Sequence, residues 1–209
     1  MGAIDFTNTT IAWPVKGMKL IAPGKSWEQV ACLEWTRGEP YARISGFRLT
    51  AELLAAHIAA TTADTDVLIF PYLFCWRQHI ELLLKDLIVG LDRLAGDVGK
   101  WPEGHRLVPL WERFVRAHES AGVARDEAIQ YIAPVIGTLN ALDPSGDAFR
   151  YHIHRDDSPT LPQLGNIAVD TIGDVMERVS NYLEAAMDEI SILLEHKADM
   201  DAELANASM

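Results

Sequence analysis

The sequence has few cysteines, few basic residues and no long uncharged apolar run. Its 209 residues include only Cys32 and Cys75, both among apolar neighbours, so we interpret them as buried free thiols of a reducing compartment. No apolar run reaches the roughly 20 residues that cross a bilayer without a charge. The first ten residues lack the basic start and apolar centre of a signal peptide. These absences predict a soluble, cytoplasmic protein with no membrane partner.

Basic residues are scarce, with 18 lysines and arginines against 30 aspartates and glutamates, a formal net charge of −12. Between Asp170 and Glu203, ten acidic residues stand against Arg178 and Lys197, which leaves a net charge of −4 for the rest. This distribution excludes a broad basic surface that wraps nucleic acid, but it allows a local basic pocket in the body of the protein.

Complete motifs for a phosphate loop, a di-iron bundle, a zinc protease or a serine hydrolase are missing from the sequence. His152 and His154 would share one face of an extended segment beside Asp156 and Asp157, which is a suitable geometry for two metal ligands. A third placed ligand is lacking, so we favour a solvated loop. We therefore expect neither a metal nor another cofactor.

What the sequence does have is the hydrophobic periodicity of α-helices. We expect an all-α helical bundle in one domain, with a flap at 1–46, a helical core at 47–165 and a long acidic helix at 166–209. The expected helices are Leu49–Ala60, Asp66–Leu94, Leu107–Ser120, Arg125–Leu142 and Asn166–Leu204, with Thr50 and Asp66 capping the first two.

The expected flap is rich in Gly, Pro and Trp, with short strand-like runs at Thr10–Val15, Met18–Ala22 and Glu28–Trp35. Such runs are typical of a small β-hairpin or an irregular segment. The last helix is the strongest prediction in the chain, because its apolar residues alternate at spacings of three and four. At a rise of about 1.5 Å per residue it would be nearly 60 Å long, so we expect a homodimer through this helix.

The central helix carries one polar line, Arg77, Glu81 and Lys85, in an otherwise apolar circumference. Spacing of four residues places the three side chains on one helix face. A helix that is apolar nearly all round is buried, and buried charge is costly unless partners satisfy it. The line is therefore either an internal structural clamp or part of a functional site.

Two further segments could join this line in a phosphate or anion site. His105 follows Gly104 at the expected start of a helix, where backbone N–H groups attract anions. Arg150 stands beside Tyr151, just after a strong turn signal. With Arg77, Glu81 and Lys85, these residues could bind a ligand. In the structural alternative, the polar line is an ion-paired network and His105 only caps its helix.

Three runs of residues resemble helical HEPN-like proteins of prokaryotes over about 70–151. These are R-x-x-I-E-L-x-L-K-x-L-I, the later G-H-x-L-x-x-L-W, and F-R-Y after a D-P-x-G-type turn. Arg106 stands where the family usually has Asp. The resemblance implies an all-α, commonly dimeric protein of a toxin–antitoxin or antiviral defence system, with an antitoxin or defence partner.

Many HEPN proteins are metal-independent ribonucleases with an Arg followed, after four to six residues, by a His. The resemblance implies that the His deprotonates a 2′-hydroxyl and the Arg stabilises the phosphate. Arg113 and His118 match this spacing, although Phe114 stands where the family has a polar residue. The expected function is thus RNA or nucleotide binding or cleavage by Arg77, His105 and Arg150, or by Arg113 and His118. The alternative is a non-catalytic dimerisation or partner-binding scaffold.

Overall fold

The computed structural model describes residues 14, 16–21, 24, 26–122, 127–154, 156–161 and 164–207. The chain divides into two compact units, Met1–Arg37 and Gly38–Met209. The first unit contains two short 3-10 helices, η2 (Trp27–Gln29) and η3 (Leu33–Thr36), and no strand among its described residues.

Of the two alternatives for Glu28–Trp35, a β-hairpin strand or an irregular segment, the strand is absent. Local i→i+3 bonding replaces it, as in the 3.0 Å bond from the Val30 N–H to the Trp27 carbonyl. A lone two-stranded hairpin is marginal in water, so short local turns can compete with it. The run Met18–Ala22 forms no strand in its described residues, and Thr10–Val15 lies outside them except for Pro14.

The second unit confirms the expected all-α bundle. Its helices are α1 (Tyr41–Thr61), α2 (Thr65–Leu94), α3 (Leu107–Ser120), α4 (Ala128–Leu142) and α5 (Val169–Ala207). In its described residues, strand-like pairing is limited to one isolated bridge between Ile153 and Pro159.

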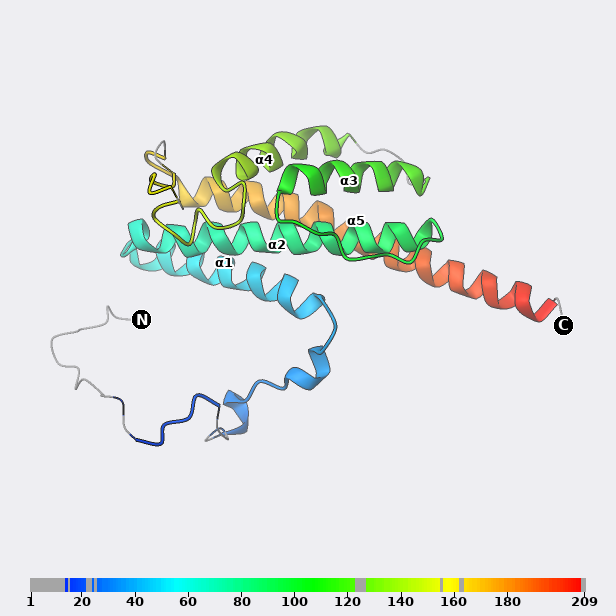
Figure 1. The fold of residues 1–209 in the computed structure, drawn as a ribbon, viewed down its shortest axis with the longest axis horizontal. Coiled ribbons are helices and arrows are strands. Elements are labelled where there is room, and N and C mark those ends of the chain that lie inside the picture. The colour runs from blue at the N-terminus through cyan, green and yellow to red at the C-terminus, as the bar shows by residue number, and fades with distance from the viewer. Residues whose placement is uncertain are drawn as a thin grey trace. The chain divides into compact units, whose positions relative to one another are not determined.

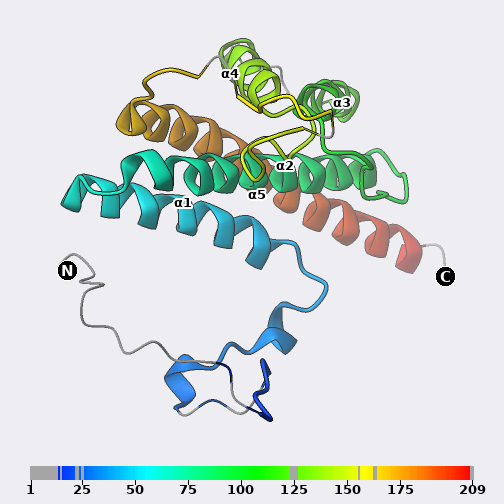
Figure 2. The ribbon, with the colours of Figure 1, turned by 60° about the vertical axis from the view of Figure 1, so that its left-hand side comes forward.

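Helix α2 is the centre of this bundle, because α1, α3 and α5 all pack on it while α4 packs on α3 (Figure 1). Turned by 60°, the α3–α4 pair is seen nearly end-on beside α2 (Figure 2). Among the described helices, α2 is also the one long and apolar enough to cross a membrane, but more than half of its apolar window is buried in the bundle. It therefore packs as the core helix of this bundle.

Helix α1 begins eight residues earlier than expected. Pro40 occupies its N-cap position, and the Pro40 carbonyl accepts the first helical bonds from Arg43 and Ile44. The predicted cap, Thr50, lies inside the helix and donates instead to the Gly46 carbonyl. The expected flap boundary at residue 46 thus falls within α1.

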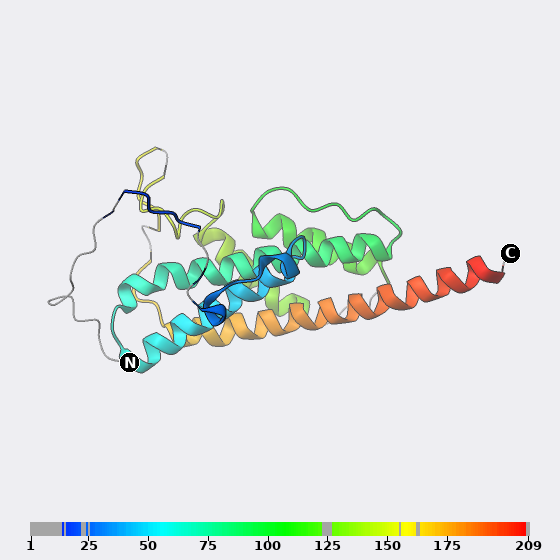
Figure 3. The same cartoon turned by 90° about the horizontal axis from the view of Figure 1, so that it is seen from below.

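Helix α5 is long, as expected, and its 39 residues extend about 58 Å at 1.5 Å per residue. Its last buried residue is Ile190, and the helix continues to Ala207. Seen from below, it runs past the ends of its neighbours (Figure 3). After the partly buried Leu194, every residue of α5 as far as Ala207 is exposed.

Candidate functional site

Arg77, Glu81 and Lys85 form a buried ion-paired line on α2. Their exposed fractions are 0%, 2% and 5%. The Arg77 Nη1 donates to Glu81 Oε2 at 2.8 Å, and the Lys85 Nζ donates to Glu81 Oε1 at 3.0 Å. The prediction that these side chains share one helix face is confirmed.

Arg77 also holds two loops that are distant in sequence. Its Nη2 donates to the His105 carbonyl at 2.6 Å, and its Nε lies 3.1 Å from both the carbonyl oxygen and Oδ2 of Asp143. The Nε hydrogen is directed at the carbonyl, so the contact with Oδ2 is an ion pair without a good hydrogen bond. Arg77 therefore joins α2 to the segments before α3 and after α4.

Asp143 completes this assembly, which we call the clamp: Arg77, Glu81, Lys85 and Asp143. The Asp143 side chain is fully buried, and its Oδ1 accepts the backbone N–H groups of the next turn, Gly146, Asp147 and Ala148, at 2.8–2.9 Å. Two positive and two negative groups balance within the clamp. Arg77 thus has its charge compensated internally and is not exposed to a ligand.

Gly146 fits this turn to the Arg77 guanidinium. Its φ is +86°, in the left-handed region that favours glycine, and a Cβ there would lie 3.1 Å from the Arg77 Nη1. The turn was expected from Asp143 to Asp147, but its role as the carboxylate partner of Arg77 was not. Asp and Asn side chains commonly accept backbone N–H groups in such turns, which is the signal the sequence offered.

His105 is the part of the assembly that reaches solvent. Its side chain is 66% exposed, and its Nδ1 lies 2.9 Å from Glu81 Oε1. Gly104, at φ +80°, allows the turn into this position, and α3 then begins at Leu107, two residues after His105. The clamp therefore holds both the backbone and the imidazole of His105.

The ionised state of the Glu81 carboxylate determines the tautomer of the His105 imidazole. Burial by itself would raise the pKa of Glu81, but hydrogen bonds from Lys85, Arg77 and His105 outweigh burial and lower it below its ordinary value. An ionised carboxylate accepts only, so Nδ1 of His105 carries the proton. In the neutral imidazole, Nε2 is then the unprotonated acceptor and can take a proton from a ligand.

Arg150 lies beside the same turn but remains exposed. Its Nε donates to the Gly146 carbonyl at 3.1 Å, and its Cζ lies 5.7 Å and 5.3 Å from the ring centroids of Phe74 and Tyr151. No carboxylate within the described ranges forms an ion pair with it. Arg77 thus holds the backbone of the His105 segment and of the turn that precedes Arg150, with Arg77 inside and His105 and Arg150 at the surface. A shared anion site of these side chains stays a prediction.

Arg113 and His118 do not form a comparable pair. Arg113 forms an ion pair with Asp92 at 2.8 Å, whereas His118 is 4% exposed and packs 5.7 Å from the Phe114 ring. Five residues along an α-helix turn by about 140°, so the two side chains point to different faces. Their sequence spacing matches the HEPN signature, but on this helix the spacing does not bring them together.

A second polar cluster was missed at the sequence level. His79 is fully buried, with Nδ1 2.9 Å from the Ile44 carbonyl and Nε2 2.7 Å from Ser180 Oγ. Arg48 donates to the same Ser180 hydroxyl and forms an ion pair with Glu184. Burial is the main cause that lowers the pKa of His79. This cluster connects α1, α2 and α5.

The chain matches no protein-family model, no curated protein and no solved structure. In the part of the chain that the structure describes, no three His, Cys, Asp or Glu side chains gather as a metal site.

Proposed function

We propose that this protein binds RNA or a nucleotide through its phosphate, and that it is a HEPN-like, metal-independent ribonuclease. One observation carries the proposal: the exposed imidazole of His105, whose Nδ1 is hydrogen-bonded to the buried carboxylate of Glu81. A carboxylate behind an imidazole sets its tautomer and orientation, as required of a general base.

In this reaction, Nε2 of His105 takes the proton of a 2′-hydroxyl while the hydroxyl oxygen attacks the adjacent phosphorus. The bond from phosphorus to the 5′-oxygen breaks, and that oxygen is protonated by water. The products are a 2′,3′-cyclic phosphate and a 5′-hydroxyl. The exposed guanidinium of Arg150 supplies positive charge to the phosphate, while Arg77 acts only by positioning His105.

The test is RNA cleavage by purified protein in the presence of EDTA. We expect cyclic-phosphate ends and their loss in His105→Ala. His57→Ala is the matched control, because His57 is an exposed histidine on α1. RNA that stays intact during long incubation at high protein concentration would contradict the ribonuclease proposal, as would full activity in His105→Ala.

A second candidate function is a non-catalytic scaffold that dimerises through α5. The observation that favours it is the row of exposed apolar residues beyond the last buried position, Leu193, Met200 and Leu204, at spacings of seven and four. Spacings of this kind place them on one helix face, as in a helix–helix seam.

Light scattering tests the scaffold directly. The dimer proposal predicts twice the monomer mass, and Leu204→Glu should shift the mass toward the monomer. Ala202→Glu is the control, because two residues turn the helix by about 200° and place the new charge on another face. A wild-type protein that remains a folded monomer at high concentration contradicts this proposal.

A further inference from the structure

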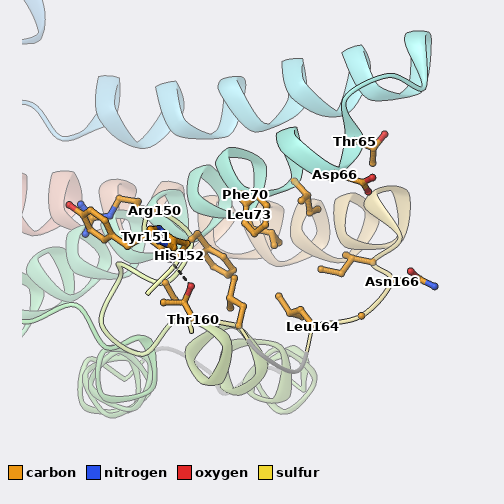
Figure 4. A pocket seen from close by; sticks show the side chains of 16 residues that line it. Thr65, Asp66, Phe70, Leu73, Arg150, Tyr151, His152, Thr160, Leu164 and Asn166 are labelled. Carbon is orange, nitrogen blue, oxygen red and sulfur yellow. Dashed lines mark hydrogen bonds between the residues drawn. The ribbon is translucent and has the colours of Figure 1, made fainter. Parts of the chain in front are cut away.

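A cavity of about 630 Å³ lies between the N-terminal half of α2 and the segment from Ala148 to Ile167. Its size is typical of a site for a small molecule. The buried apolar side chains of Leu73 and Phe149 line it. Charged and polar side chains, Asp66, Arg150 and Asn166, line it as well (Figure 4). This combination suits a ligand with a flat apolar body and polar ends.

The two ends of the cavity carry opposite charge. Figure 4 shows Arg150 at one end and Asp66 at the other, with Phe70 and Leu73 between them. Arg150 lies over the Phe74 ring, and Asp66 is eight residues earlier on the same helix. Eight residues of α-helix rise about 12 Å, so the cavity can bind a ligand with an anion at one end and hydrogen-bond donors at the other.

The wall at the Arg150 end is fixed by hydrogen bonds. Thr160 donates its backbone N–H to the His152 carbonyl at 3.1 Å and its hydroxyl to the Tyr151 carbonyl at 2.6 Å. The exposed side chains of Arg150 and His152 therefore extend from an anchored loop and could contact a phosphate together. A preformed wall reduces the ordering that a ligand must cause.

We propose that this cavity binds a guanine nucleotide, either free or as a guanosine of RNA. Arg150 and His152 contact the phosphate, and the base stacks on Phe70, whose side chain is 45% exposed. Asp66 accepts hydrogen bonds from the base edge. The inference rests on the proposed function, because Arg150 is the phosphate-binding residue in both.

The choice of guanine follows from the chemistry of Asp66. An ionised carboxylate has two acceptor oxygens and no donor. Guanine places two donors side by side on its Watson–Crick edge, the ring N1–H and the exocyclic N2–H₂. On the same edge, adenine and cytosine set one donor beside an acceptor, and uracil flanks its donor with two acceptors. Asn166, at the same end of the cavity, offers an amide to the guanine O6.

Calorimetric titration of the full chain with GMP, AMP, CMP, UMP and inorganic phosphate tests this assignment. We expect GMP to bind about tenfold or more tightly than the other nucleotides, since a bidentate pair gives discrimination of this order. Asp66→Asn should reduce GMP affinity to the level of AMP. Asp64→Asn, the same change two residues earlier and outside the cavity, should keep the preference.

Arg150→Gln should lower the affinity for all four nucleotides by the same factor, because it removes a phosphate contact and leaves the contact of Asp66 with the base edge unchanged. Thermal melting of each variant identifies any loss of folding. Equal affinity for the four nucleotides, binding of none, a GMP preference that survives Asp66→Asn, or phosphate binding as tight as GMP would each overturn the assignment. RNA cleavage without preference for guanine would contradict this inference alone, whereas selective GMP binding without RNA binding or cleavage would contradict only the ribonuclease part of the proposed function.

Discussion

Replacing Glu81 with glutamine is the most informative perturbation of the clamp. Glutamine keeps the shape of the side chain and removes its charge. The Arg77 and Lys85 groups, both nearly or fully buried, would then share the single carboxylate of Asp143. An uncompensated positive charge would remain in the core.

The expected cost follows from that charge imbalance. Breaking a buried ion pair by removing one partner typically lowers the free energy of unfolding by about 3–5 kcal/mol. The matched control is Glu52→Gln, which breaks an ion pair with Arg48 at the same i,i+4 spacing but with a carboxylate side chain 47% exposed. Exposed pairs contribute less than about 1 kcal/mol.

A double variant separates charge balance from lost hydrogen bonds. Lys85→Met added to Glu81→Gln removes the excess positive charge, so the double variant should be more stable than Glu81→Gln alone by about 1–3 kcal/mol. Urea unfolding followed by circular dichroism measures all four proteins, with the m-value as the check on two-state behaviour. A loss below 1 kcal/mol in Glu81→Gln, or a further loss in the double variant, would refute the reasoning.

Three other predictions concern protonation and backbone geometry. Hydrogen bonds outweigh burial and lower the pKa of Glu81 below 4.5. The ionised carboxylate therefore stabilises the fold above pH 4.5, and this stabilisation is lost as the pH falls through the pKa of the folded state. The urea midpoint should accordingly decrease less on acidification in Glu81→Gln than in the wild-type protein. Burial lowers the pKa of His79 below 6.5, so below this pH the unfolded chain binds a proton at His79 more readily than the folded protein does. The free energy of unfolding should therefore decrease as the pH falls from about 6.5, and this decrease should be smaller in His79→Gln. Gly146→Ala should lower the free energy of unfolding by at least about 1 kcal/mol more than Gly96→Ala in the same assay. Both glycines have a positive φ, but only at Gly146 would the added Cβ contact Arg77. Equal losses of stability in the two variants would contradict that contact.

Local pattern was sufficient to predict most of the helices. The bounds of α3 agree with the prediction, because turn-forming residues flank its amphipathic segment at both ends. The start of α1 was missed, since Ser45-Gly46 suggests a break and the helix has no clear apolar face. There, burial of Ile44 at the helix start outweighs the weak local propensity.

The candidate site was only partly predictable. Arg77, Glu81 and Lys85 belong to one helix, so their spacing fixes their shared face. Asp143 is 66 residues from Arg77, and such a pairing depends on how α4 and its following turn pack on α2. The same limit applies to Arg113 and His118, whose spacing matches a motif while packing separates their side chains.

The central claim is that a buried carboxylate orients an exposed imidazole toward RNA. An NMR spectrum of ¹⁵N-labelled histidine side chains, recorded with and without a short RNA, tests it most directly. The account predicts that His105 carries its proton on Nδ1, that Glu81→Gln weakens this preference, and that the Nε2 signal shifts when RNA is added. An imidazole protonated on Nε2 in the wild-type protein, with no response to RNA, would contradict it.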